Sequence, residues 1–230
     1  MSKQSVLVSA SVSCMDLSDL RAAVREVEES QVSFYHFDVV DGRFNQCFIL
    51  GEATLENMKG ITGIPIEAHL AVYDPELYIG RFARAGADYI AVHYEAMEDP
   101  GEIFAQIRQT GAKPVLAYRA DTAPGEDFPE LAAQVEWVLK LTVNPGFSGQ
   151  KLQPQAVEHI RRMRQMADRA GLSVRIEADG NINSSTIRTV TEAGADILTG
   201  GSSGLFCKGG TVSRHCQEML AAAGEQVVYQ

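Results

Sequence analysis

The chain has 230 residues, of which 45% are hydrophobic, and its formal net charge is −10. This length and apolar content suffice for one domain with a substantial core, and the acidity argues against broad binding to nucleic acids or anionic membranes, which reward clustered Lys and Arg. A small anionic substrate is still compatible with this charge, because a local nest of backbone N–H groups can hold a phosphate.

Strand-like and helix-like stretches alternate along the chain. Short apolar runs predict strands at 6–12, 34–40, 64–72, 89–93, 114–118, 137–143, 173–178 and 197–201. Helical patterns between them predict helices that include 17–29, 76–85, 102–109, 155–170 and 184–193. Two connections are near-duplicates, RAGAD at 84–88 and EAGAD at 192–196. In each, we expect the glycine to end a helix in the left-handed conformation, directly before a strand.

Eight repeats of strand and helix over residues 1–230 predict an α/β fold, a single (β/α)8 TIM barrel. No Pro/Ser-rich linker or charge block divides the chain, so we expect one domain. A doubly wound open sheet is the competing architecture, and it often carries a glycine-rich turn after the first strand. Here the first strand ends in SVSC (11–14), without glycine, so the barrel is favoured.

Cysteine usage and the start of the chain bear on the cellular compartment. The four cysteines form no C-x-x-C pair, and a chain of this size does not need disulfides, so we expect reduced thiols. Residues 5–14 loosely imitate a lipoprotein signal, but their apolar run is short and broken by serines, and a first barrel strand explains them better. No other segment is apolar for long enough to span a membrane. We expect a cytoplasmic protein.

Four potential metal ligands, His36, Asp38, His69 and Asp179, stand at the downstream ends of predicted strands. In a barrel these ends converge on one mouth, and residues at i and i+2 of a strand, such as His36 and Asp38, point to the same face. Taken singly, each could be a structural histidine or a helix-capping aspartate. Two uncompensated carboxylates in a barrel mouth would be costly, so the set of four favours one divalent metal: Zn, Fe(II), Mn or Co.

Glycine-rich loops follow the last three predicted strands. They are NPGFSGQ (144–150), Gly180 and GGSSG (200–204). Gly146 and Gly149 allow a tight turn with exposed backbone N–H groups, and phosphate sites of barrels recur at the last loops, so we predict phosphate binding here. His93 and Glu95 could be mistaken for a further ligand pair. We interpret them as structural residues that line the barrel, because the metal already has four candidate ligands.

Five segments resemble the ribulose-phosphate 3-epimerase family in an ordered series between residues 9 and 206. They are HFDVVDGRF (36–44), EAHLAV (67–72), AGADYIAVHYEA (85–96), TVNPGFSGQ (142–150) and IEADG (176–180). The resemblance implies a barrel of the ribulose-phosphate-binding type. Two further segments, CMDL (14–17) and SGLF (203–206), look more like the allulose-6-phosphate 3-epimerase branch of the family.

The resemblance implies metal-dependent epimerisation at C3 of a phosphorylated ketose. The residues matching His36, Asp38, His69 and Asp179 bind the metal in this family, and those matching Asp38 and Asp179 act as the acid/base pair of a two-base 1,1-proton transfer through an enediolate. The resemblance also implies a homo-oligomer, a dimer or larger. It assigns substrate binding to Ser11, His69, Gly146, Phe147, Ser148, Gly149, Gly180, Asn181, Gly201 and Ser202.

The match breaks at positions that face the substrate in the family. Methionines are usual there at the positions of Val40, Ala71 and Leu141, and Arg119-Ala120 stands where Asn-Pro is usual. We expect retained proton chemistry with an altered pocket, in which these positions set specificity. Arg119 could fork onto a phosphate or carboxylate, or it could be a solvated loop residue that pairs with Asp121.

Several functions fit these residues. The first is epimerisation of ribulose 5-phosphate and xylulose 5-phosphate, and the second is epimerisation of a six-carbon ketose phosphate such as allulose 6-phosphate. A lyase of a related barrel would need an Asp-x-Lys-x-x-Asp motif, whereas residues 36–41 read HFDVVD, without lysine. A non-catalytic sugar-phosphate sensor is the remaining alternative, and it would have little need of two acid/base carboxylates.

Overall fold

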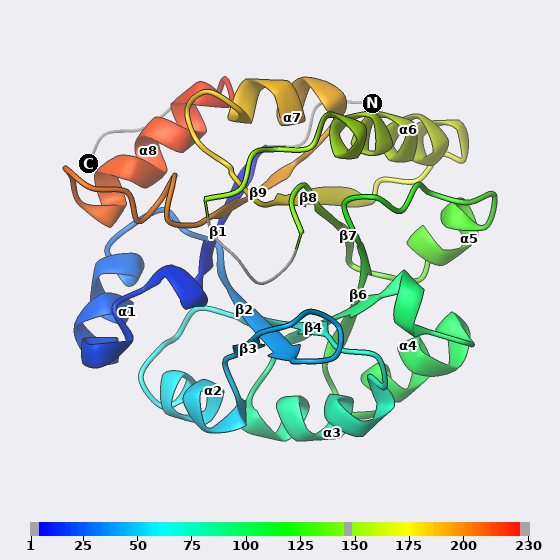
Figure 1. Ribbon diagram of the computed structural model, residues 1–230, viewed down its shortest axis with the longest axis horizontal. Helices are drawn as coiled ribbons and strands as arrows, with labels where there is room; N and C mark the ends of the chain where they lie inside the picture. Colours follow the sequence, from blue (N-terminus) through cyan, green and yellow to red (C-terminus); the bar gives the residue numbers. More distant parts are fainter. Residues whose placement is uncertain (1–4, 145–148, 226–230) are drawn as a thin grey trace.

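The computed structural model describes residues 5–144 and 149–225. Eight parallel strands pair in the order β1-β9-β8-β7-β6-β5-β4-β2, and a further pairing of β1 with β2 closes the ring. The closed ring with its surrounding helices confirms the predicted (β/α)8 TIM barrel (Figure 1). Its strands are β1 (Leu7–Ser11), β2 (Phe34–Asp41), β4 (Ile66–Ala71), β5 (Tyr89–His93), β6 (Lys113–Tyr118), β7 (Trp137–Leu141), β8 (Arg175–Asp179) and β9 (Ile197–Gly200).

Helices surround the barrel (Figure 1). They are α1 (Leu20–Glu28), α2 (Glu52–Lys59), α3 (Glu76–Ala85), α4 (Pro100–Gln109), α5 (Phe128–Ala132), α6 (Pro154–Arg169), α7 (Ile187–Ala193) and α8 (Val212–Ala222), with 3-10 turns η1 (Val12–Cys14), η2 (Leu17–Asp19) and η3 (Tyr94–Ala96). All five helices named from the sequence are present, and α2, α5 and α8 complete the ring. Within the described part of the chain, no helix combines the length and the hydropathy that crossing a bilayer requires.

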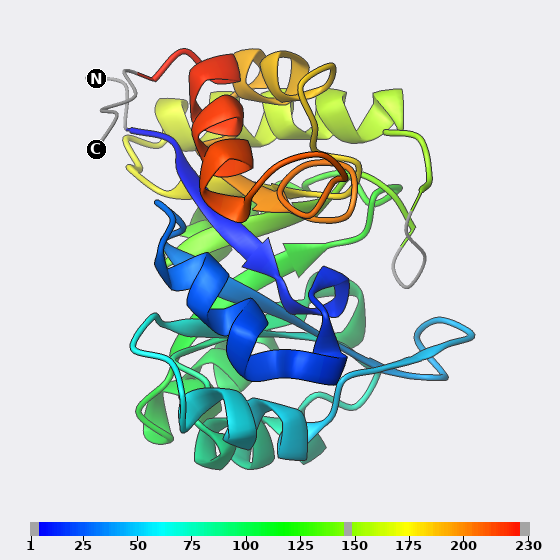
Figure 2. The same ribbon diagram turned by 90° about the vertical axis from the view of Figure 1, so that its left-hand side faces the viewer.

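A short hairpin extends β2 beyond the barrel, and the sequence did not predict it. Strand β3 (Phe48–Ile49) pairs antiparallel with the end of β2, with Val40 opposite Ile49 and Asp41 opposite Phe48. Figure 2 shows this hairpin projecting away from the barrel body. The Asp41 carboxylate accepts hydrogen bonds from the backbone N–H groups of Arg43 and Phe44, both at 2.9 Å, and so holds the turn.

Glycine ends two of the helices in the left-handed conformation, as the repeated A-G-A-D segments predicted. Gly86 follows α3 with φ 111°, and Gly194 follows α7 with φ 116°. A Cβ atom at Gly194 would lie 2.6 Å from Cβ of Arg164. Only glycine fits there without strain, so these two positions fix where helix gives way to strand.

Successive side chains of each strand point alternately out of and into the barrel, and this separates two apolar layers. Outward-facing residues such as Val8, Leu70 and Val92 pack against helix residues such as Ile79 and Ile160. A second, smaller cluster closes one part of the barrel interior. Its buried members are Phe34, Ala91, Val115, Ala117, Trp137, Leu139 and Ile197. Toward the carboxyl ends of the strands the inward-facing side chains become polar, and the candidate site begins there.

Candidate active site

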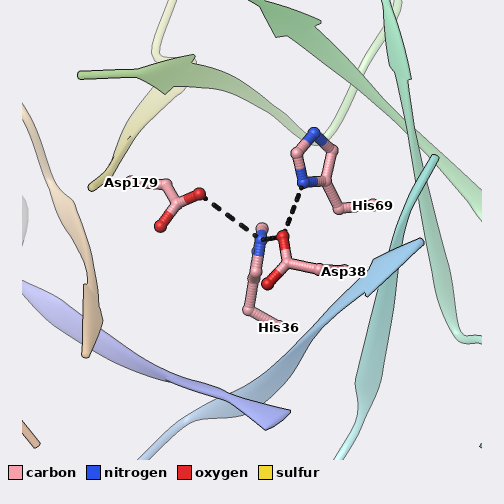
Figure 3. A group of neighbouring side chains, drawn as sticks. All are labelled: His36, Asp38, His69 and Asp179. Atoms are coloured by element: carbon pink, nitrogen blue, oxygen red, sulfur yellow. Dashed lines mark hydrogen bonds and ion pairs between the residues drawn. The ribbon is translucent and has the colours of Figure 1, made fainter. Parts of the chain in front are cut away.

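The four predicted metal ligands meet at the carboxyl ends of three strands (Figure 3). His36 and Asp38 lie on β2, His69 on β4 and Asp179 at the end of β8. Asp38 Oδ1 lies 3.1 Å from both His36 Nε2 and His69 Nδ1, and Asp179 Oδ2 lies 3.7 Å from His36 Nε2. One ligand atom of each side chain lies within 4.8 Å of the others. Two imidazoles and two carboxylates at this spacing fit a divalent first-row cation.

The two carboxyl groups of this site have opposite pKa shifts. Burial raises the pKa of Asp38, but the charge of His36 and hydrogen bonds from His36 and His69 outweigh burial, so this pKa lies well below its ordinary value. Burial raises the pKa of Asp179 to about 7. Near neutral pH and without a cation, Asp38 is therefore ionised while Asp179 is partly protonated. Such a split is what a pair of acid and base groups requires.

Two buried glutamates support His36 from the side away from the mouth. Glu67 Oε2 lies 2.7 Å from His36 Nδ1, and this contact orients the ring so that Nε2 faces the ligand group. Glu177 Oε1 lies 3.6 Å from the same nitrogen. The oxygens of Glu177 also accept hydrogen bonds, at 2.8 to 3.0 Å, from Ser9, Trp137 and Thr199.

His36, Glu67 and Glu177 lie close enough to share an ion of their own. Both glutamates are fully buried, and their oxygens are already occupied by hydrogen-bond donors. Burial raises the pKa of Glu67 to about 8, whereas hydrogen bonds from His36, Thr199 and other donors outweigh burial and lower the pKa of Glu177. Because these donors already occupy both glutamates, we interpret them as support for His36 rather than a second metal site.

Sequence reasoning missed this support, although the sequence carries a signal for it. Glu67 and Glu177 each precede a predicted ligand by two residues, His69 and Asp179, so the four side chains share the inward face of their strands. A charged residue in an otherwise apolar strand, two positions before a ligand, indicates a hydrogen-bond partner inside the barrel. Ser13 was also missed, and its hydroxyl donates to Asp38 Oδ2 at 3.0 Å.

A cavity of about 280 Å³ opens beside the ligand group, with Asp38, His69 and Asp179 on its wall. Seven of the residues predicted to bind substrate line it: Ser11, His69, Gly149, Gly180, Asn181, Gly201 and Ser202. Gly146, Phe147 and Ser148 of the same prediction lie outside the described residues. The described glycine-rich loops after β7, β8 and β9 therefore share one cavity with three of the four predicted metal ligands.

A turn in the left-handed conformation follows Asp179 directly. Gly180 has φ 118°, and Asn181 has φ 52°. A Cβ atom at Gly180 would lie 2.4 Å from Cγ2 of Val143, so glycine is required at this position. The Thr142 hydroxyl donates to the carbonyl of Asp179 at 3.0 Å and also to that of Gly180, which fixes the turn at the cavity wall.

The four positions expected to set specificity fall in different places. Leu141 lines the cavity. Val40 and Ala71 are buried in a small cluster with Phe44 instead. The guanidinium of Arg119 is directed to Phe44 and Tyr73, and it donates to the Phe44 carbonyl at 3.2 Å and to the Tyr73 hydroxyl at 3.1 Å. Leu141 is thus the one of these four on the wall of the described cavity.

His93 contacts His69 on the side away from Asp38, and Glu95 contacts His93. His93 Nε2 lies 2.8 Å from His69 Nε2, and His93 Nδ1 lies 3.1 Å from Glu95 Oε2. Burial lowers the pKa of His69 to about 4, and it also lowers the pKa of His93. For Glu95, burial raises the pKa, but the hydrogen bond from His93 and other contacts outweigh burial and bring it to about 2. Glu95 is therefore an ionised hydrogen-bond acceptor at neutral pH.

The sequence is similar to proteins of known name over most of its length. The profile of the "Ribulose-phosphate 3 epimerase family" matches residues 7–206. The ribulose-phosphate 3-epimerase of Methanocaldococcus jannaschii is 35% identical over 197 residues, which cover 86% of this chain and 83% of that protein. The enzyme of the same name from Chlamydia muridarum is 35% identical over 228 residues, which cover 98% of each.

Solved structures show the same barrel at low sequence identity. The crystal structure of 3-hexulose-6-phosphate synthase has a TM-score of 0.65 at 17% identity and covers 94% of this chain and 99% of that one. A mutant tryptophan synthase α-subunit from Pyrococcus furiosus has a TM-score of 0.64 at 14% identity and covers 97% and 99%. These likenesses establish the fold alone. From the family profile and the relatives, the chain belongs to the ribulose-phosphate 3-epimerase family and is an isomerase that acts on carbohydrates.

Proposed function

We propose that the protein is a metal-dependent 3-epimerase of a phosphorylated ketose, and that it works by two-base 1,1-proton transfer. The observation that carries this proposal is the pair Asp38 and Asp179. Both carboxylates lie beside His36 Nε2 at the wall of one cavity, Asp38 on β2 and Asp179 on β8. Two carboxylates that face one cavity from different strands are what a two-base proton transfer requires.

Inversion at C3 requires one group to remove the proton and another to return a proton from the opposite face of the planar enediolate. In one direction Asp38 accepts the C3 proton and Asp179 donates, and in the reverse direction their roles exchange. Ser13 and Ser11 orient Asp38, because their hydroxyls lie 3.0 and 3.4 Å from its Oδ2 atom. These contacts leave Oδ1 directed toward the two histidines.

The donor set fits one divalent cation, Zn, Fe(II), Mn or Co, held by His36, Asp38, His69 and Asp179. When bound, the cation supplies Lewis-acid stabilisation of the negative charge that develops on the sugar oxygens. Its charge also removes the cost of placing two carboxylates, each about one-fifth exposed, beside one another. Both carboxylates are then available for their separate roles.

The phosphate of the substrate binds at the part of the cavity wall that the glycine-rich loops form. Backbone N–H groups of successive left-handed or glycine residues form concave sites for anions, and Gly180, Asn181 and Gly201 provide such backbone beside the ligand group. Gly149 and Ser202 add to the same wall. The proposal also includes Gly146, Phe147 and Ser148 of the neighbouring loop, on the basis of the family resemblance.

Ribulose 5-phosphate is the first substrate to test, because the relatives carry the name ribulose-phosphate 3-epimerase. A six-carbon ketose phosphate is the second candidate, since Leu141, at a position where the family usually has methionine, lines the cavity. We would follow exchange at C3 by proton NMR in heavy water, with metal-loaded protein and ribulose 5-phosphate, allulose 6-phosphate or tetrulose 4-phosphate. Exchange and appearance of the epimer with one sugar support the proposal and name its substrate.

The variant Asp179→Asn is expected to abolish epimerisation, because an amide can neither donate nor accept the proton at C3. Asp121→Asn is the matched control, since Asp121 is exposed and does not line the cavity. Full epimerase activity of Asp179→Asn would contradict the assigned role. Tight sugar-phosphate binding in calorimetry, without exchange of any of the three sugars by metal-loaded protein, would instead favour the sensor.

The family resemblance also supports a homo-oligomer. The chain has a mass of 25.0 kDa, so sedimentation equilibrium is expected to give at least twice this value. The mass of a single chain throughout the micromolar range would contradict this part of the proposal.

A further inference from the structure

His69, His93 and Glu95 form a continuous hydrogen-bonded chain that leads away from the ligand group. The Nε2 atoms of the two histidines lie 2.8 Å apart, and His93 Nδ1 lies 3.1 Å from Glu95 Oε2. The two imidazoles are buried, with side-chain exposures of 1% and 0%, and Glu95 is 18% exposed. Bulk water therefore cannot replace the contact between the two imidazoles.

The chain of contacts allows one arrangement of protons when His69 binds a cation. A nitrogen that binds a metal needs its lone pair, and His69 Nδ1 is the atom that faces Asp38. His69 Nε2 then carries the proton and donates it to His93 Nε2. A neutral His93 that accepts at Nε2 carries its own proton on Nδ1 and donates to Glu95, whose carboxylate accepts.

Arg119 supports this hydrogen-bonded chain of side chains through its backbone N–H and through its guanidinium. Its backbone N–H donates to Glu95 Oε1 at 2.8 Å, so that the carboxylate presents Oε2 to His93. Its guanidinium lies 3.9 Å from the centre of the Phe44 ring, and that ring lies 4.5 Å from the centre of the His93 ring. Hydrogen bonds to the Phe44 carbonyl and the Tyr73 hydroxyl keep the guanidinium in place.

We propose that Arg119 and Glu95 are positioning residues for the metal ligand His69. Through His93 they hold the His69 ring so that its Nδ1 is free to bind the cation. This inference rests on the cation site of the proposed function. It adds a role to residues that do not line the described cavity. It also gives a reason for the arginine at position 119, where the family usually has asparagine, because the guanidinium packs on the Phe44 ring and that ring contacts the His93 ring.

The first test is Glu95→Gln, with the affinity for zinc measured by competition with a chromophoric chelator. His93 Nδ1–H and the Arg119 backbone N–H face different oxygens of Glu95, and a glutamine has an NH2 group in place of one of them, so it cannot present an acceptor to both donors. We expect zinc to bind about tenfold to a hundredfold more weakly, as is typical when the hydrogen-bond partner of a ligating histidine is lost. Circular dichroism and thermal unfolding confirm that the variant is folded.

The second test compares Arg119→Ala with Arg119→Lys. Both retain the backbone N–H, but alanine removes the planar group that covers Phe44, and lysine keeps only the charge. We expect about tenfold weaker zinc binding for alanine and a smaller loss for lysine. Arg43→Ala is the matched control, because Arg43 lies next to Phe44 in the hairpin loop and pairs with Asp74 at an exposed site. Its zinc affinity is expected to equal that of the unchanged protein.

A third measurement reports the histidine tautomers and would not respond to a merely structural role. Long-range proton–nitrogen NMR of zinc-loaded protein with labelled histidine is expected to show His93 protonated at Nδ1, with Nε2 as acceptor, and Glu95→Gln is expected to disturb this pattern. His93→Gln identifies the signal.

Two results would overturn the inference: His93 protonated at Nε2 in the zinc-loaded protein, or unchanged zinc affinity in both Glu95→Gln and Arg119→Ala. If Arg119→Ala does not fold, Arg119→Lys and Glu95→Gln decide the question. No sugar is present in these measurements. If the variants lose zinc affinity and the unchanged, metal-loaded protein epimerises none of the sugars, this inference is supported while the proposed function is contradicted.

Discussion

The four candidate metal ligands come together only in the folded protein. His36 and Asp38 share a strand, but His69 and Asp179 come from other strands, and only the closed barrel brings a ligand atom of each within 4.8 Å of the others. The residue types and their positions at strand ends were visible in the sequence. The hydrogen-bond partner of each histidine ring, Glu67 for His36 and His93 for His69, became evident only from the contacts.

His69→Ala is expected to weaken zinc binding by at least about a hundredfold, because loss of a ligand costs more than loss of its hydrogen-bond partner. Metal content after dialysis, measured by atomic emission, checks the result. His159→Ala is the control, since His159 lies on α6 outside the ligand group. An equal metal content in both variants would contradict the assignment of His69 as a ligand.

Among the elements, the eight barrel strands and five of the helices were named from the sequence, whereas α2, α5, α8 and β3 were not. Helix α5 has five residues and β3 has two, which is too short for a period to appear. The segment predicted as one helix at 17–29 is divided, because the Asp19 carboxylate accepts from the backbone N–H of Ala22 and caps α1 there. Boundaries of this kind depend on one local hydrogen bond.

Gly194→Ala tests whether the glycine that ends α7 is required. The left-handed conformation costs an alanine about 1–2 kcal/mol, and its Cβ would also lie 2.6 Å from Cβ of Arg164, which is not a movable end of a side chain. We expect the free energy of unfolding in urea to fall by more than about 2 kcal/mol. Gly171→Ala is the matched control, because Gly171 has φ 70° with no atom within 4 Å of the added carbon. Equal losses in both variants would show that the close contact has no effect.

For the whole molecule, Lys140 links stability to pH. This lysine is fully buried, its amine donates to the carbonyls of Arg119 and Thr122, and burial lowers its pKa from 10.5 to about 7. Between these two values the unfolded chain binds a proton that the folded chain lacks. The free energy of unfolding therefore rises with pH in this window, by up to about 1.4 kcal/mol per pH unit, and the contribution is lost as the pH falls to about 7.

Lys140→Met removes the titrating group at similar volume and isolates this effect from other groups. The difference in unfolding free energy between the unchanged protein and the variant is expected to increase from about pH 7 to about pH 10. Urea unfolding at several pH values measures it. Parallel curves for the two proteins across this range would show that Lys140 does not titrate in the folded state as described.

The amino-acid sequence by itself determined the barrel and the residue types of the candidate site, because hydrophobic periodicity and glycine positions are local properties and the carboxyl ends of barrel strands always share one mouth. The tertiary structure decided which side chains touch. Arg119 lies 75 residues from Phe44 along the chain, and its guanidinium contacts that hairpin residue rather than the described cavity. Contacts between loops of different strands depend on the packing of the whole mouth, which no local pattern encodes.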